Sequence, residues 1–130
     1  MMSIELKILL WSVVLGIAQL LAAAQASTKQ RGLQWNFSPR DEKPEPLTGV
    51  GARIDRAWQN FRESFPLFLA AVILVQLTGR NNLTTAIGVQ LYFWARIFYV
   101  PLYALGIPVV RTLVWTASMV GIALLLIGLM

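Results

Sequence analysis

Apolar runs long enough to cross a membrane dominate this sequence, and they limit its fold more than any other feature. They lie at about residues 4–26, 60–78, 83–105 and 109–130. A membrane-spanning helix needs about 20 predominantly apolar residues. Only 13% of the 130 residues are charged, about half the usual share for a soluble domain. The sequence therefore predicts an all-α integral membrane protein with four spans, forming one domain over residues 1–130.

The first apolar run allows two interpretations. Ala24-Gln25-Ala26 resembles the small-residue cleavage site of a signal peptide. However, Glu5 offsets Lys7 at the basic start, and the run is long for a signal core. We therefore predict an uncleaved first span and keep cleavage as the alternative.

Residues 27–51 predict one long loop, because they combine charges with three prolines and three glycines. This loop and the polar start of the next helix also hold most of the basic residues: Lys29, Arg31, Arg40, Lys43, Arg53, Arg56 and Arg62. By the positive-inside rule, the loop is cytosolic and both termini lie outside. The later connections are short, which predicts antiparallel neighbours in an up-down bundle.

The residue types restrict the chemistry. The chain has no cysteine and no histidine, which excludes a protein thiolate nucleophile, a disulfide framework and the usual proton shuttle near neutral pH. The formal net charge of +5 is more typical, in so apolar a chain, of loop orientation and of binding to anionic lipid or ligand than of nucleic-acid binding.

Two polar stripes follow helical spacing on neighbouring spans. The first comprises Arg53, Arg56, Asn60 and Glu63, and the second comprises Tyr92, Arg96, Tyr99 and Tyr103. Steps of three and four place each set on one helix face. Because the two helices run in opposite directions, both stripes lie at the same depth on the cytosolic side. The sequence thus predicts a site between them.

A structural role is the alternative for each of these residues. Arginines near span ends reach the headgroup layer, and tyrosines form interfacial belts. Arg96 is different, because burying it within a span costs at least about 2.5 kcal/mol. We expect Glu63 or Asn60 to be its partner, and a purely structural Arg96–Glu63 pair remains an alternative.

Together these motifs resemble the MAPEG family, the membrane-associated proteins of eicosanoid and glutathione metabolism. The segment RAWQNFRESFP, residues 56–66, and the segment ARIFY, residues 95–99, are similar to its bacterial members. Tyr103 and Arg111 follow in the family's order. The similarity extends over the whole chain in span number, long first loop and motif position.

The resemblance implies a left-handed four-helix bundle that assembles as a homotrimer, in a bacterial inner membrane. It also implies glutathione as cosubstrate, bound between subunits near the cytosolic side. The matching glutathione ligands are Arg56, Asn60, Glu63, Arg96, Tyr99 and Tyr103. Arg111 is the candidate for activating the thiol, Arg31 is a weaker one, and Tyr99 assists by hydrogen bonding.

Two departures affect these assignments. The turn at Gly106-Ile107-Pro108 changes the spacing to Arg111, and either Arg31 or Lys29 matches the family's arginine at the end of the first span. The resemblance leads to a glutathione-dependent transferase or peroxidase that acts on a hydrophobic electrophile or lipid hydroperoxide. The alternatives are a non-catalytic lipid-binding or scaffold protein of the same fold and, less favoured, a small channel subunit.

Overall fold

A computed structural model describes all residues from 1 to 130, and every regular element in it is a helix. The helices are α1 (Ile4–Arg31), α2 (Leu33–Phe37), α3 (Gly49–Thr78), α4 (Leu83–Ala104) and α5 (Pro108–Leu129). The all-α prediction is therefore confirmed. The helix count differs, because five helices are present: four long ones and the short α2.

The predicted loop over residues 27–51 was wrong in much of its first half, and its last three residues, 49–51, belong to α3. α1 continues to Arg31, because Lys29 and Arg31 in its last turn complement the negative end of the helix dipole. Gly32 then ends the helix with φ +88°, a conformation that favours glycine. The apolar residues Leu33 and Phe37 lie in the following short helix α2. The irregular part of the loop is confined to residues 38–48.

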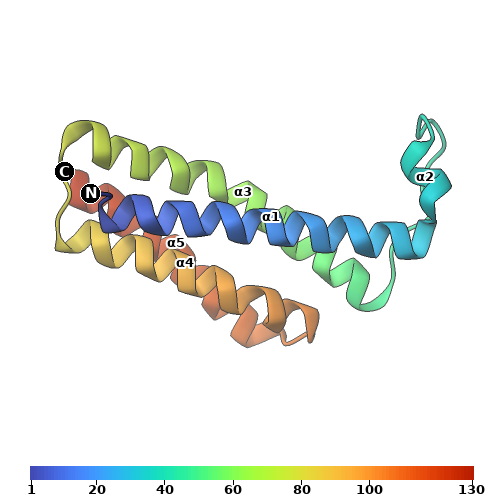
Figure 1. Cartoon of the computed structure of the whole chain (residues 1–130). Helices are drawn as coiled ribbons and strands as arrows, with labels where there is room; N and C mark the ends of the chain where they lie inside the picture. Colours follow the sequence, from blue (N-terminus) through green and yellow to red (C-terminus); the bar gives the residue numbers. More distant parts are fainter.

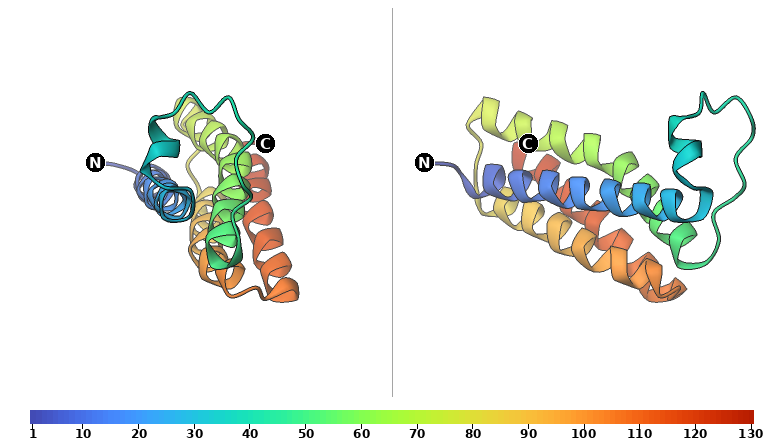
Figure 2. Two further views of the ribbon diagram at one scale, coloured as in Figure 1. Left: turned by 90° about the vertical axis from the view of Figure 1, so that its right-hand side faces the viewer. Right: turned by 45° about the vertical axis from the view of Figure 1, so that its right-hand side comes forward.

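The long helices alternate in direction, as predicted for an up-down arrangement (Figures 1 and 2). Both termini and the α3–α4 turn lie at one end of the bundle, called here the terminal end. The α2 segment and the α4–α5 turn lie at the opposite end, called the loop end. α2 runs across the direction of α1, beyond the bundle.

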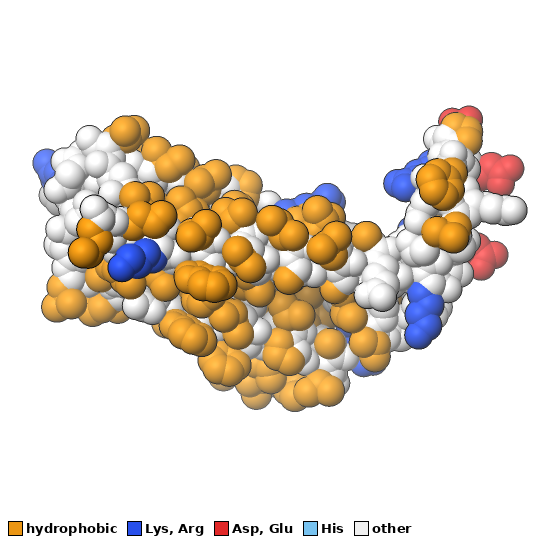
Figure 3. Space-filling model, in the orientation of Figure 1, with side chains coloured by type: hydrophobic (Ala, Val, Ile, Leu, Met, Phe, Trp, Pro, Cys, Tyr) orange, Lys and Arg blue, Asp and Glu red, His pale blue; other side chains and the backbone are white.

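Three helices, α1, α3 and α5, are long and apolar enough to cross a membrane. α4 has 22 residues but contains Gln90 and Arg96 and does not reach the same hydropathy. The apolar side chains cover the long helices in Figure 3, and charged ones gather mainly over the α2 segment. Leu67, Leu77 and Leu113 are each more than 60% exposed, which suits contact with lipid rather than water.

The core joins all four long helices, with Ile8 of α1 among its buried residues. Phe68 stacks on Tyr92 with ring centroids 4.0 Å apart, and the buried Tyr92 hydroxyl shares a 3.0 Å hydrogen bond with Ser64. α4 and α5 approach closely at Gly88 and Gly121, where a Cβ on either residue would lie 2.7 Å from the other's carbonyl oxygen. This contact fixes the relative position of two helices that carry predicted site residues.

Candidate functional site

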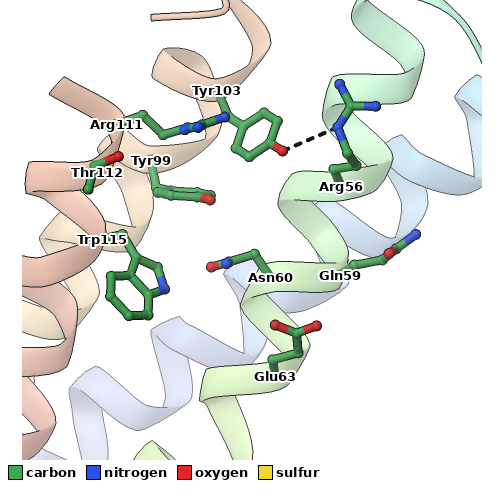
Figure 4. A pocket seen from close by; sticks show the side chains of 9 residues that line it. All are labelled: Arg56, Gln59, Asn60, Glu63, Tyr99, Tyr103, Arg111, Thr112 and Trp115. Atoms are coloured by element: carbon green, nitrogen blue, oxygen red, sulfur yellow. Dashed lines mark hydrogen bonds between the residues drawn. The ribbon is translucent and has the colours of Figure 1, made fainter. Parts of the chain in front are cut away.

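A cavity of about 360 Å³ opens between α3 on one side and α4 and α5 on the other (Figure 4). Its lining is mostly polar, although the protein is mostly apolar. The lining residues are Arg56, Gln59, Asn60, Glu63, Tyr99, Tyr103, Arg111, Thr112 and Trp115. The two predicted stripes therefore meet, and α5 adds a third part of the wall.

The α3 wall presents one face of a single helix. α3 is helical throughout residues 56–63, so the spacing of Arg56, Asn60 and Glu63 keeps these three side chains in line along the cavity. Arg53, the first member of the predicted stripe, lies outside the cavity and donates from Nη1 to the carbonyl oxygen of Ala104 at 3.2 Å. Arg53 therefore connects α3 to the end of α4.

Tyr103 lies between two arginines from opposite walls. Arg56 Nε donates to Tyr103 Oη at 3.2 Å, and the Arg56 Cζ is 5.8 Å from the ring centroid. The Arg111 Cζ lies 4.6 Å from the same centroid. Two guanidinium groups therefore face one cavity, and Glu63 supplies the only carboxylate in its lining. This charge pattern suits a ligand with more than one anionic group and one cationic group.

Arg96 does not line the cavity but lies behind its wall, 1% exposed. Its Nη2 donates to Asn60 Oδ1 at 2.9 Å, and its Cζ lies 4.3 Å from the centroid of the Tyr99 ring. Glu63 and Asn60 were the two predicted partners of Arg96, and the structure shows the neutral one, Asn60. The Nε and Nη1 atoms of Arg96 are buried without a hydrogen-bond partner.

The bond to Arg96 decides what Asn60 offers to a ligand. Arginine has only donors, so it must meet the amide oxygen of Asn60. The Asn60 amide nitrogen, with its two donors, then remains for the cavity. Arg96 consequently affects the cavity through the orientation of Asn60 and through its charge, rather than by direct contact.

The comparison with protein families agrees with this architecture. A model described as the MAPEG family matches residues 8–130. The chain belongs to the MAPEG family. A search of curated proteins finds no match. The family contains glutathione transferases and peroxidases as well as non-catalytic members, so membership fixes the fold class and membrane character but not an activity.

Of the residues that the family resemblance assigned as glutathione ligands or as the main thiol-activating arginine, all but one line the cavity of this MAPEG protein, whereas Arg53 and Tyr92 of the two stripes lie outside it. Arg56, Asn60, Glu63, Tyr99, Tyr103 and Arg111 line the cavity, and only Arg96 lies behind it. The weaker candidates lie elsewhere. Arg31 donates from Nε to the carbonyl oxygen of Glu45 at 3.0 Å, and Lys29 lines a different hollow beside α1.

Three residues of the MAPEG cavity were not foreseen from the sequence. Gln59 adjoins the predicted stripe on α3, and its Nε2 donates to Asp55 Oδ2 at 2.7 Å. Trp115 follows Arg111 by four positions, so helical spacing from Arg111 would have identified it, whereas Thr112, one position after Arg111, has no such signal. They were missed because Arg111 was the only residue of the fourth span that was considered for the site.

Proposed function

We propose that this MAPEG protein is a glutathione-dependent membrane transferase or peroxidase. The observation that carries the proposal is the pair of guanidinium groups, Arg56 and Arg111, on either side of Tyr103 in a cavity whose single carboxylate is Glu63. Glutathione has two carboxylates, one ammonium group and a thiol. Its charges therefore match the cavity in sign and in number.

Each lining residue has a specific role in this proposal. Arg56 holds a glutathione carboxylate by charge-assisted hydrogen bonds, and Glu63 holds the ammonium group. Asn60 donates from its amide to a peptide carbonyl or a carboxylate. Arg111 lies near the thiol and stabilises its ionised form, and Tyr99 donates a hydrogen bond to the sulfur. Arg96 keeps Asn60 in place.

The energy needed to ionise the thiol is within reach of these residues. A free thiol titrates near pH 8.5, so shifting its pKa to about 6.5–7 requires about 2–3 kcal/mol. One charge-assisted hydrogen bond supplies about 1.5–3 kcal/mol. An arginine beside the sulfur is therefore sufficient, and the absence of histidine is no obstacle. The nucleophile arrives with glutathione, which also explains why no cysteine is needed.

Two reactions are compatible with this arrangement. In transfer, the thiolate forms a C–S bond with an electrophilic carbon, and the bond to the leaving group breaks or a strained ring opens, with a proton taken up by the product. In peroxidase chemistry, the thiolate attacks the terminal oxygen of a lipid hydroperoxide, which releases an alcohol and leaves a sulfenic acid. A second glutathione then gives the disulfide and water.

The membrane arrangement forms part of the proposal. α4 crosses the membrane with α1, α3 and α5, the loop end faces the cytosol and both termini lie outside. Three copies assemble as a homotrimer in a bacterial inner membrane. The basic residues of the loop end support this orientation, and the family resemblance supports the trimer.

The test is glutathione binding to the purified protein in detergent, followed by ultraviolet absorbance of the thiolate near neutral pH. We expect binding with a thiolate signal, and then turnover of a hydrophobic electrophile. S-methyl glutathione is the matched control, because it should bind without the absorbance. Binding without thiolate would favour the non-catalytic alternative, and no binding by the folded protein would reject the glutathione site.

A further inference from the structure

Three buried polar side-chain atoms of this protein have no hydrogen-bond partner within the chain, and only two residues carry them. They are Oε1 of Gln19 on α1 and the Nε and Nη1 atoms of Arg96 on α4. Gln19 is 5% exposed and Arg96 is 1% exposed. Buried polar groups in folded proteins are normally hydrogen-bonded. One of these atoms is an acceptor and the other two are donors, so the three are complementary.

The ring of Phe61 on α3 relates the two residues in space. Gly16 on α1 faces this ring, because a Cβ on Gly16 would lie 3.0 Å from Phe61 Cε1. Gln19 follows Gly16 by three positions on the same buried face of α1. The Cζ atom of Arg96 lies 5.7 Å from the centroid of the Phe61 ring. The buried face of α1 and the guanidinium of α4 therefore both adjoin this one ring.

Local hydrogen bonds bring the atoms without partners to the same level of the bundle. Gln19 Nε2 donates to the carbonyl oxygen of Leu15 at 3.5 Å, which turns the amide back by one helical turn. Because only the amide nitrogen can donate to that carbonyl, Oε1 is the atom left over. Arg96 Nη2 donates to Oδ1 of Asn60, the residue before Phe61. The amide of Gln19 and the guanidinium of Arg96 thus lie at the level of Phe61.

One water molecule fits this set of atoms. A water accepts two hydrogen bonds and donates two, so it can accept from Nε and Nη1 of Arg96 and donate to Oε1 of Gln19. These three bonds are the usual number for a buried water. A chloride or a carboxylate suits the position less well, because it would face the lone pairs of Gln19 Oε1 without a proton between them.

We propose that Gln19 is a positioning residue for Arg96, and that one buried water joins its amide oxygen to the guanidinium. Arg96 in turn orients Asn60, which lines the cavity. Helix α1 contributes no residue to the cavity lining but affects the cavity through this chain of contacts. The effect on glutathione rests on the proposed function, whereas the link between Gln19 and Arg96 does not.

A double-mutant cycle of folding stability tests the link. Gln19→Leu removes the acceptor and Arg96→Met removes the donors, and equilibrium unfolding in detergent compares the single and double variants. We expect Gln19→Leu to lower the folding equilibrium constant about five-fold more in the wild type than in Arg96→Met, as for the loss of one hydrogen bond. Equal effects in the two backgrounds would overturn the proposal.

Ser12→Ala is the matched control for this cycle. Ser12 is buried on the same face of α1, but its hydroxyl already donates to the carbonyl oxygen of Ile8 at 2.8 Å. Its substitution should therefore have the same effect with and without Arg96. A coupling of Ser12 to Arg96 as large as that of Gln19 would show general loosening of α1 and would contradict a specific contact.

The water is tested directly by nuclear magnetic resonance of the protein with ¹⁵N-labelled arginine in detergent. We expect a cross-peak between the Arg96 Nε–H, assigned by its loss in Arg96→Lys, and a long-lived water. This cross-peak should disappear in Gln19→Leu and persist in Ser12→Ala. A folded wild type without it, or a Gln19→Leu variant that keeps it, would overturn the bridge. This measurement also decides the question if Arg96→Met does not fold.

Glutathione binding tests the effect on the cavity. Gln19→Leu should weaken binding about five-fold in the wild type and leave it unchanged in Asn60→Leu, because the effect passes through Asn60. Gln19→Glu keeps an acceptor on a side chain of the same length and should retain wild-type affinity. Equal losses in both backgrounds, or no loss in the wild type, would show that Gln19 does not orient Asn60. If the folded wild type binds no glutathione, the proposed function fails, while the folding cycle and the water cross-peak still decide the link between Gln19 and Arg96.

Discussion

The Arg96 guanidinium donates to Asn60 Oδ1 at 2.9 Å, and this bond links α4 to α3 behind the cavity wall. It is the only hydrogen bond of a buried cation whose other two nitrogens lack partners. Phe61 and Tyr99 contribute ring contacts to the same guanidinium, at 5.7 and 4.3 Å. The bond therefore has a role in stability as well as in the orientation of Asn60.

Substitution of Asn60 should separate these roles. Asn60→Leu leaves Arg96 without a hydrogen bond, and we expect the free energy of unfolding to fall by about 2–3 kcal/mol. Asn60→Asp places a carboxylate beside the buried cation, so its stability should equal or exceed that of the wild type. Unfolding in detergent, followed by circular dichroism, measures both. Equal losses of stability in the two variants would show that the side chain at position 60 does not stabilise the buried charge of Arg96.

Glu63 should determine affinity for the ammonium group of glutathione. Glu63→Gln should weaken glutathione binding by about 1–2 kcal/mol, because it removes a charge-assisted contact in an open cavity. The same variant should bind a glutathione analogue without the amino group as tightly as the wild type does. Equilibrium binding of both ligands to both proteins completes a double-mutant cycle. A coupling energy near zero would show that the ammonium group of glutathione does not contact Glu63.

Arg111 should control ionisation of the bound thiol. Arg111→Ala should raise the thiol pKa by about 1–2 units while leaving much of the binding intact, since a pKa unit corresponds to about 1.4 kcal/mol of lost interaction with the thiolate. The effect appears as a thiolate absorbance that develops only at higher pH. Arg111→Lys retains a positive charge and should give a smaller shift. Lys7→Ala, which removes a charge at the terminal end, is the control, and a shift of the same size there would disprove a local effect.

The two polar stripes could be predicted from the sequence alone, because residue spacing determines which side chains share a face of a continuous helix. Arg56, Asn60 and Glu63 line one wall because α3 is helical throughout residues 56–63. Long apolar runs likewise identified the spans, since the bilayer requires them. Arg96 could be recognised as unusual from its depth, but not its choice of Asn60 over Glu63, because that choice depends on how α4 is rotated against α3.

The sequence was less informative where partners come from distant segments. Glu5 was considered only for its effect on the charge near the first span, yet it is 2% exposed and accepts a 2.6 Å hydrogen bond from Thr85 Oγ1 on α4. Nothing local to either residue indicates this pairing. Helix α2 was missed for a related reason, since five residues between charged and proline-rich segments give too short a pattern to distinguish a helix from a loop.

Gly121 should be required for the spacing of α4 and α5. A Cβ at this position would lie 2.7 Å from the Gly88 carbonyl oxygen and 2.7 Å from the Tyr92 nitrogen, both backbone atoms that cannot rotate away. Gly121→Ala must therefore push the helices apart, and we expect a loss of about 1–3 kcal/mol in the free energy of unfolding. Ala123→Val adds bulk at an exposed position of the same helix and should change stability by less than about 0.5 kcal/mol.

The same variant links packing to the cavity. α4 carries Tyr99 and Tyr103 and α5 carries Arg111, so a shift between these helices alters the contact of Arg111 with Tyr103. We therefore expect Gly121→Ala to raise the pKa of bound glutathione's thiol, although Gly121 does not line the cavity. Thiolate absorbance of the folded variant measures this change, with Ala123→Val as reference. A destabilised variant with an unchanged thiol pKa would show that the cavity does not depend on the Gly88–Gly121 contact.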